Sequence, residues 1–288
     1  MAWLETNNAR IHYEDVGKGE PIIANHGLAE DSGYWSETGV TAKLADRYRV
    51  ISMDMRAHGR TVATGEPYGY DADTMADDFD ALADELGVER FHLLTHATGG
   101  MVGARYAMTR SERLISLMLT DTGSATRPKM PGLETEEELQ RAIEEAEQRL
   151  KVPPSVEEMM VYMKANPGPF LFKMAEHPDS ERMWKIYEGF LRRADRKQII
   201  TFQLNFYTDP DPRVESLRQI KCPTLVLLGE FDIVFLEPSA LMAKEIRDVR
   251  HVIMEGVGHM TAIEAPERTI KELLDFLETV AETGKANR

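Results

Sequence analysis

The sequence is poor in cysteine and in basic residues. Cys222 is the single cysteine among 288 residues, which excludes an internal disulfide and a zinc site built from several cysteines. Lys and Arg number 34 against 49 Asp and Glu, so the formal net charge is −15. Nucleic acids and anionic membrane surfaces bind through Lys and Arg, and both are therefore unlikely partners by charge. The lone thiol favours a reducing compartment.

Long hydrophobic runs are missing as well. No stretch approaches the roughly 20 apolar residues that cross a bilayer, and the amino-terminal "MAWLETNNARIHYED" has no basic segment followed by an apolar one. We therefore expect a cytoplasmic protein. The histidine spacings and glycine-rich turns match no metal or phosphate-binding motif, so no cofactor is expected. Nothing in the sequence indicates an oligomeric state.

What the sequence does contain is a regular alternation of strand-like and helical segments. Buried, continuously apolar runs such as "PIIANHG", "YRVISMD" and "FHLLTH" are separated by helical patterns, among them about 35–46 and "DADTMADDFDALADELG". Such alternation predicts an α/β fold, with a mostly parallel central sheet and helices on both faces. The length and the hydrophobic fraction of 42% suit one large domain with an insertion.

The alternation stops after Asp121, and the chain then shows only helical patterns until about Pro212. We expect residues 125–212 to form a helical cap, inserted after the sixth core strand into a core made of 1–124 and 213–288. The cap is rich in Met and aromatic side chains, and most of them should form its own core. A minority, together with core residues, should wall a pocket for a hydrophobic small molecule. The candidates for that wall are Trp35, Met163, Trp184, Tyr187, Phe235 and Met260.

One stretch, "FHLLTHATGGMVGARYA", reads as a strand, a tight turn and a small-residue helix. This order matches the nucleophile elbow, G-x-S-x-G, which holds a reactive side chain at the end of a strand beside free helix amides. The five positions here are Thr95, His96, Ala97, Thr98 and Gly99. Alanine therefore stands where the nucleophile should be.

The other parts of an acyl-transfer site are present in the sequence. His259 follows the last strand in "EGVGHMTAIEAPE" and could act as a base, and Asp232 in "LLGEFDIVF" could hold it in one tautomer. Asp121, at the end of "LISLMLTD", is a rival acid. The amides of Leu28 in "NHGLAEDSGYW" and of Thr98 could stabilise an oxyanion. Nucleophile position, acid and histidine occur in the chain order of the elbow enzymes.

Together these motifs, in this order and over nearly the whole chain, resemble the α/β-hydrolase superfamily, specifically its cap-bearing group of esterases, lactonases and carbon–carbon bond hydrolases. The resemblance implies that position 97 is the nucleophile, Asp232 the acid and His259 the base, with Leu28 and Thr98 at the oxyanion hole. Two residues depart from the pattern. Thr95 replaces the first glycine of the elbow, and Ala97 removes the nucleophile, which costs on the order of 10⁶ in turnover in a serine protease.

Several explanations of Ala97 follow from the sequence. An introduced serine-to-alanine change would leave an inactive hydrolase of a hydrophobic ester or lactone, or of a carbon–carbon bond, with the rest of its site intact. A natural ligand-binding member would need no nucleophile, but Asp232 and His259 would then have no reason to remain. Cofactor-free oxygenation would use His259 alone. An aspartate nucleophile in the ancestor is disfavoured by Thr98, where such enzymes usually carry tryptophan.

Overall fold

The computed structural model describes residues 2–287, and its centre is a nine-stranded sheet. Along the main path the strand order is β1-β2-β4-β3-β6-β7-β8-β9, and the short β5 pairs with β2. The strands from β4 to β9 along this path are parallel, whereas β1, β2 and β5 pair antiparallel. The strands are β1 (Ala2–Thr6), β2 (Ala9–Gly17), β3 (Pro21–Asn25), β4 (Arg49–Met53), β5 (Val62–Ala63), β6 (Phe91–His96), β7 (Leu114–Thr120), β8 (Thr224–Gly229) and β9 (Val249–Met254).

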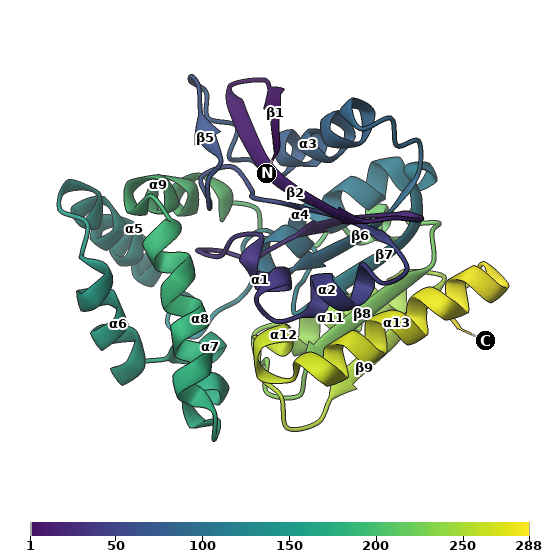
Figure 1. Ribbon diagram of the computed structural model, residues 1–288. Coiled ribbons are helices and arrows are strands. Elements are labelled where there is room, and N and C mark those ends of the chain that lie inside the picture. The colour runs from purple at the N-terminus through teal and green to yellow at the C-terminus, as the bar shows by residue number, and fades with distance from the viewer. Residues whose placement is uncertain (1, 288) are drawn as a thin grey trace.

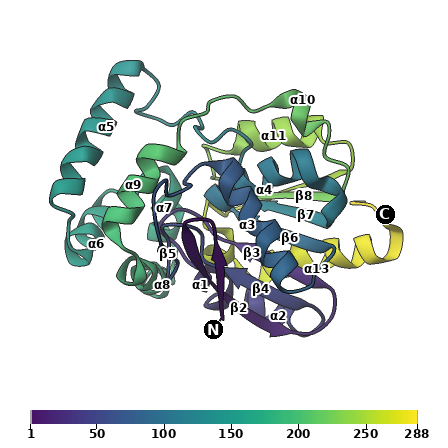
Figure 2. The same ribbon diagram turned by 90° about the horizontal axis from the view of Figure 1, so that it is seen from above.

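The predicted α/β fold is confirmed, and it follows from the burial of the central strands. Every residue of β6 and β8 is buried, as expected for strands covered on both faces. Helices α3 and α4 pack together on one face with α11, whereas α2 and α13 cover the other (Figure 2). The helices of the core are α1 (Gly33–Ser36), α2 (Val40–Leu44), α3 (Ala72–Glu85), α4 (Ala97–Arg110), α10 (Val214–Leu217), α11 (Leu236–Glu245), α12 (Thr261–Glu264) and α13 (Pro266–Thr283), with a 3-10 turn at Ser111–Arg113.

Two local expectations differ from the structure. The single helix expected over about 35–46 is divided into α1 and α2 at Gly39, whose φ of 82° a helix interior cannot accommodate. The strands β1, β2 and β5 were not expected, because β1 and the end of β2 mix buried and exposed positions and lack a continuous apolar run.

The helices expected between 125 and 212 form a separate layer beside the carboxyl ends of the strands (Figure 1). They lie in the chain between β7 and β8, so the insertion follows the sixth strand of the sheet's main path. Ser155 and Thr135 begin two of them with capping boxes. The cap helices are α5 (Glu136–Lys151), α6 (Val156–Ala165), α7 (Gly168–Glu176), α8 (Ser180–Arg193) and α9 (Arg196–Phe206).

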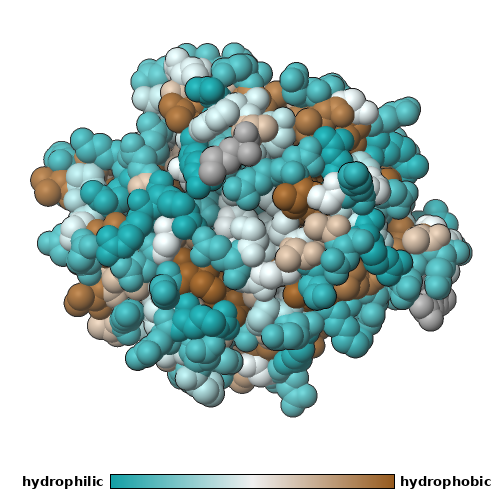
Figure 3. Space-filling view, in the orientation of Figure 1, coloured by the Kyte–Doolittle hydropathy of each residue, from teal (hydrophilic) through white to brown (hydrophobic). Residues whose placement is uncertain are grey.

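The surface carries no extended hydrophobic face in the view of Figure 3, where hydrophilic side chains predominate and hydrophobic ones are scattered in small patches. None of the helices within residues 2–287 has the length and hydropathy needed to span a membrane. Most of the cap's Met and aromatic side chains are buried against the core or against each other, including Met174, Met183, Phe190 and Phe202.

Candidate active site

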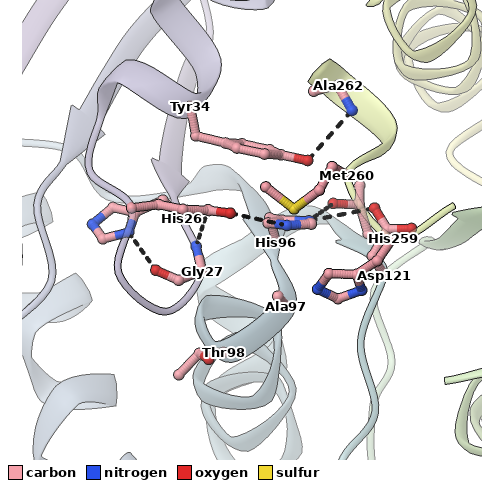
Figure 4. A network of polar contacts seen from close by, with 12 residues as sticks. His26, Gly27, Tyr34, His96, Ala97, Thr98, Asp121, His259, Met260 and Ala262 are labelled. Atoms are coloured by element: carbon pink, nitrogen blue, oxygen red, sulfur yellow. Dashed lines mark hydrogen bonds and ion pairs between the residues drawn. The ribbon is translucent and has the colours of Figure 1, made fainter. Parts of the chain in front are cut away.

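The turn between β6 and α4 has the geometry of a nucleophile elbow. Ala97 begins α4 with a φ of 46°, a left-handed conformation that is strained for any residue with a Cβ. The turn is tight because small residues follow: a side chain at Gly99 would collide with the His26 carbonyl, and one at Gly100 with Thr122. Figure 4 shows Ala97 at the start of the helix with Thr98 next to it. The structure therefore keeps the strained position although its side chain is a methyl group.

Thr95 occupies the elbow's first glycine position, and a second glycine makes room for it. Its hydroxyl donates to the Met118 carbonyl on the neighbouring strand at 3.2 Å. A Cβ added at Gly103, two turns into α4, would lie only 2.9 Å from the Thr95 Cγ2 atom. The close approach of helix and strand is thus preserved by moving the small residue from the strand to the helix.

Asp232 and His259 form a direct buried contact at the ends of β8 and β9. The distance between His259 Nδ1 and Asp232 Oδ2 is 2.9 Å, and Asp232 is fully buried. The imidazole packs between Phe170 and Phe235, at ring-centroid distances of 4.6 and 5.5 Å. No hydrogen bond within residues 2–287 engages His259 Nε2, so this atom is available to a ligand in the cavity described below. The pair has the arrangement that lets a histidine act as a base.

Asp121, the rival acid, lies close to this pair but has other partners. Its carboxylate accepts hydrogen bonds from the Gly229 amide at 3.2 Å and the Thr261 hydroxyl at 2.5 Å. Asp121, Asp232 and His259 could each offer a metal ligand atom, all within 4.8 Å of one another. Both Asp121 oxygens accept hydrogen bonds and Asp232 Oδ2 contacts His259, which leaves Asp232 Oδ1 as the one carboxylate oxygen of this group without a partner among the described residues. The arrangement therefore fits an acid–histidine pair with a supporting carboxylate better than a metal centre.

The loop after β3 brings the Leu28 amide beside the elbow, where the Thr98 amide at the start of α4 lies. His26 shapes this loop: its Nδ1 contacts the Gly27 carbonyl at 2.8 Å, and its Nε2 accepts from the Met55 amide at 3.0 Å. No hydrogen bond within the described chain engages the amides of Leu28 and Thr98, and both residues line one cavity with Ala97. Two free donors beside the nucleophile position are what an oxyanion hole requires.

Three buried residues next to Ala97 were not predicted, namely Glu30, Tyr34 and His96. His96 Nδ1 lies 3.3 Å from Asp121 Oδ2, and its Nε2 lies 3.5 Å from Glu30 Oε1, which is ion-pair distance without good hydrogen-bond geometry. The Tyr34 ring stacks on the imidazole with centroids 4.1 Å apart (Figure 4). Glu30 in "NHGLAED" and His96 in "THATGG" are both visible in the sequence. The sequence alone does not show that their side chains lie close together in the fold.

The charges around His96 keep it protonated. Burial alone would lower the pKa of this imidazole, but the charge of Glu30 and the contact with Asp121 outweigh burial and raise the pKa to about 9. For the Asp121 carboxyl, burial has the opposite sign and raises the pKa above its ordinary value, and the nearby His96 opposes this effect. Behind Ala97, the structure therefore holds an imidazolium between two carboxylates.

A cavity of about 630 Å³ opens over Ala97 between the cap and the core. Four of the predicted wall residues line it, namely Met163, Tyr187, Phe235 and Met260. The prediction is wrong for Trp35 and Trp184. Trp35 is 1% exposed and donates from its indole nitrogen to the Asn25 carbonyl inside the core, and Trp184 packs within the cap against Tyr187.

The cap is fastened to the site at two points. The Tyr207 hydroxyl, just after α9, lies 2.6 Å from Thr98 Oγ1 at the elbow. Arg193 at the end of α8 contacts Asp31 in the loop that carries Leu28, with 2.5 Å between Nε and Oδ2, and also contacts Glu37. The cap therefore contributes both to the roof of the cavity and to the position of the loop.

A family model described as "alpha/beta hydrolase fold" matches residues 20–266. Among curated proteins, a non-heme haloperoxidase of Rhodococcus erythropolis is 27% identical over 95% of this chain and 98% of its own length. A 2-hydroxy-6-oxononadienedioate/2-hydroxy-6-oxononatrienedioate hydrolase of Paraburkholderia phymatum is 26% identical, covering 93% of this chain and 91% of that protein.

The fold of this chain is also similar to that of solved structures. A thermophilic esterase from Thermogutta terrifontis, with malate bound, superimposes with a TM-score of 0.78 at 26% identity. The alignment covers 97% of this chain and 98% of the esterase.

Proposed function

The chain belongs to the alpha/beta hydrolase fold family, and on that premise we propose that its cavity binds a hydrophobic small-molecule ester or lactone as a serine-type hydrolase would. Position 97 is then the place of the nucleophile. In the chain as it stands, Ala97 has no atom that can attack a carbonyl, so the site binds such a molecule and does not turn it over at an enzymatic rate.

The observation that carries this proposal is the 2.9 Å contact between Asp232 and His259 beside Ala97 and the cavity. A buried carboxylate on Nδ1 fixes the histidine tautomer and leaves Nε2 directed away from the acid. A cavity that only stored a ligand would gain nothing from this contact, whereas a base acting on a residue at position 97 depends on it.

The mechanism follows from the groups around position 97 when a serine stands there. Nε2 of His259 takes the serine proton while the hydroxyl oxygen attacks the carbonyl carbon. The oxygen of the tetrahedral intermediate is stabilised by the amides of Leu28 and Thr98. The protonated His259 then gives its proton to the leaving alcohol, and water activated by the same histidine releases the acid from the acyl-enzyme.

A carbon–carbon bond hydrolase is the second candidate, favoured by the similarity to the Paraburkholderia phymatum hydrolase over nearly the whole chain. It would use the same position 97, acid and base. Ester panels and a vinylogous 1,5-diketone substrate distinguish the two, because only the carbon–carbon enzyme releases a carboxylic acid from the diketone.

The test is to restore the nucleophile. We expect Ala97→Ser to raise the hydrolysis of p-nitrophenyl esters of several chain lengths by orders of magnitude, because a nucleophile acting within a triad contributes that much. The matched control is Ala97→Ser combined with His259→Gln, which keeps the hydroxyl but removes its base. A gain below about tenfold for Ala97→Ser on every ester and on the diketone would contradict the proposal.

A further inference from the structure

The wall of the cavity over Ala97 carries charged and neutral polar side chains, and most of them already have partners. Glu30 accepts a hydrogen bond from the Gly27 amide and lies 3.5 Å from His96. Partners within residues 2–287 also engage the side chains of Thr98, Thr135, Asn166, Tyr207 and His259. The polar wall residues that are left without a partner therefore indicate where a polar group of a ligand binds.

Arg127 lines the cavity and is partly buried. Its guanidinium forms no hydrogen bond or ion pair with any other residue of the described chain. The other charged wall residues without an ion pair are exposed, namely Lys129, Glu134 and Glu136. Water and salt screen the charges of exposed groups more strongly than those of partly buried ones, so Arg127 is the least screened of these unpaired charges.

The arginines elsewhere in the protein show that the missing partner is unusual. Among the described residues, the other partly or fully buried arginines form ion pairs with a carboxylate, except Arg196. Arg196 does not line the cavity. Carboxylates are plentiful in a chain with 49 Asp and Glu against 34 Lys and Arg. Because burying an unpaired charge is costly, the guanidinium of Arg127 calls for an acceptor that the described chain does not provide.

The fold places Arg127 beside an aspartate whose carboxylate is used by other arginines. The Arg127 amide donates to the Asp209 carbonyl at 2.8 Å, just after α9. The Asp209 carboxylate accepts from Arg105 at 3.2 Å and from Arg213 at 3.0 Å. The backbone at position 127 is thus fixed against the end of the cap, while its side chain stays available to a ligand.

Two neutral side chains of the wall also lack partners. Tyr187 is 7% exposed and Gln203 is partly buried, and both line the cavity. No hydrogen bond within residues 2–287 engages the Tyr187 hydroxyl or the Gln203 amide. Both groups can donate or accept, whereas a guanidinium only donates. The two can therefore bind various polar atoms of a ligand, but Arg127 determines the charge that the ligand should carry.

We propose that Arg127 binds a carboxylate of the ligand, separated by an apolar body from the carbonyl that lies over Ala97. The ligand class is an ester or lactone that also carries a free carboxylate. One guanidinium compensates one negative charge and can hold a carboxylate through two hydrogen bonds. A doubly charged phosphate would be left with excess charge facing Glu134 and Glu136. The proposal rests on the proposed function for the place of the carbonyl.

The binding experiment uses the Ala97 chain, so it requires no catalysis. The probes are the monomethyl esters of adipic, pimelic and suberic acid, whose lengths sample different separations of carbonyl and carboxylate. Each is paired with the methyl ester of the fatty acid of equal length, in which a methyl group replaces the carboxylate. We expect Arg127→Met to weaken the binding of at least one half-ester by about tenfold or more at pH 7, measured by calorimetry. The paired fatty ester should bind both proteins equally.

Arg196→Met is the matched control, because Arg196 is also partly buried and without an ion pair but lies outside the cavity wall. It should leave the binding of the half-esters intact. Lys129→Met removes an exposed positive charge of the wall, and its effect should be smaller than that of Arg127→Met. An equal loss in Lys129→Met would mean that general positive charge attracts the half-esters, and it would overturn the proposal.

Unchanged binding of every half-ester in Arg127→Met would also overturn the proposal, as would a failure of all three to bind the Ala97 chain. An equal loss for the fatty esters would show that Arg127 supports the shape of the cavity and does not recognise a charge. Circular dichroism establishes that each variant is folded. If Arg127→Met does not fold, Arg127→Gln replaces it with the same expected loss.

A kinetic experiment separates this proposal from the proposed function. In the Ala97→Ser protein, Arg127→Met should raise KM for the half-ester and leave KM for the paired fatty ester unchanged. An active Ala97→Ser protein whose KM values do not respond to Arg127→Met would support the hydrolase and overturn the carboxylate site. An inactive Ala97→Ser protein whose binding of half-esters still depends on Arg127 would support the carboxylate site and contradict the hydrolase.

Discussion

Two neighbouring acid–histidine pairs in the site differ in ways that separate chemistry from structure. Asp232 and His259 come from the ends of β8 and β9, whereas His96 and Asp121 come from the ends of β6 and β7, and the two imidazole centroids are 5.1 Å apart. His259 has a carboxylate on one nitrogen and the cavity on the other side. His96 is fully buried between two carboxylates and beneath Tyr34.

The comparison shows that the second partner of a histidine decides its role. A histidine with one acid and one free nitrogen can exchange a proton with a ligand. A histidine with carboxylates on both nitrogens keeps its proton and acts as a fixed positive charge. Under the proposed function, the same two residue types therefore supply a base in one pair and a structural ion in the other.

The largest expected effect comes from removing each acid in turn from the Ala97→Ser protein. Asp232→Asn should lower kcat by around 10⁴, because the amide favours the wrong tautomer of His259. Asp121→Asn should cost much less, since its carboxylate contacts His96 and Thr261. Steady-state kinetics on the best ester of the panel measures both. The reverse ranking would show that Asp121 is the functional acid.

Stability should respond to the two histidines in the opposite order. His96→Gln leaves Glu30 and Asp121 buried without their shared cation, and breaking a buried ion pair in this way costs about 3–5 kcal/mol of unfolding free energy. His259→Gln also removes a partner of the buried Asp232, but the glutamine amide can still donate to that carboxylate, so the cost should be smaller, about 1–2 kcal/mol. Urea denaturation at pH 7 gives both values. A similar cost for the two variants would remove the distinction drawn above.

The pH dependence of stability follows from the raised pKa of His96, about 9 in the folded protein against 6.5 ordinarily. The contribution of the imidazolium is fully present below about pH 6.5 and is lost as pH rises through 9. It amounts to on the order of 3 kcal/mol, at 1.36 kcal/mol for each pKa unit. The stability difference between the unmutated protein and His96→Gln, measured by urea denaturation, should therefore shrink between pH 6.5 and 9. A constant difference over this range would mean that His96 is not protonated in the fold.

The histidines also show how far the sequence alone reaches. The fold and the elbow were predictable because each motif is local and the motifs occur in a recognisable chain order. The closeness of Asp232 and His259 was also predictable, since both follow neighbouring strands at one edge of a parallel sheet. Glu30 was not, because the direction of a loop carboxylate depends on the Gly27 amide and on His96, which are fixed only by the completed fold.

The sequence also did not show which aromatic residues line the cavity. Trp35 and Trp184 are as apolar as the residues that do line the cavity, but Trp35 is held in the core through its indole nitrogen and Trp184 faces the interior of the cap. Hydrophobic periodicity tells which side of a helix is buried, and it does not tell whether that side meets another helix or a cavity.

The smallest predicted effect concerns the elbow itself. Gly103→Ala places a methyl 2.9 Å from Thr95 Cγ2 and should cost about 1–3 kcal/mol through overpacking. Combining it with Thr95→Gly should recover part of the lost stability, because removing the threonine side chain from the strand makes space for the new methyl group on the helix. A double-mutant cycle by urea denaturation measures the coupling. Additive costs in the cycle would contradict the exchange of small residues between strand and helix.

The insertion of the cap has a consequence for how the protein folds. Leu117 of β7 pairs with Thr224 of β8 across the whole cap sequence, so this strand pair closes a long loop, and closing long loops between distant strands slows folding. During synthesis the elbow and the cap leave the ribosome well before Asp232 and His259 do. During synthesis the chain therefore has an unpaired sheet edge at β7 until β8 has been made. The contact between Asp232 and His259 can form only after that.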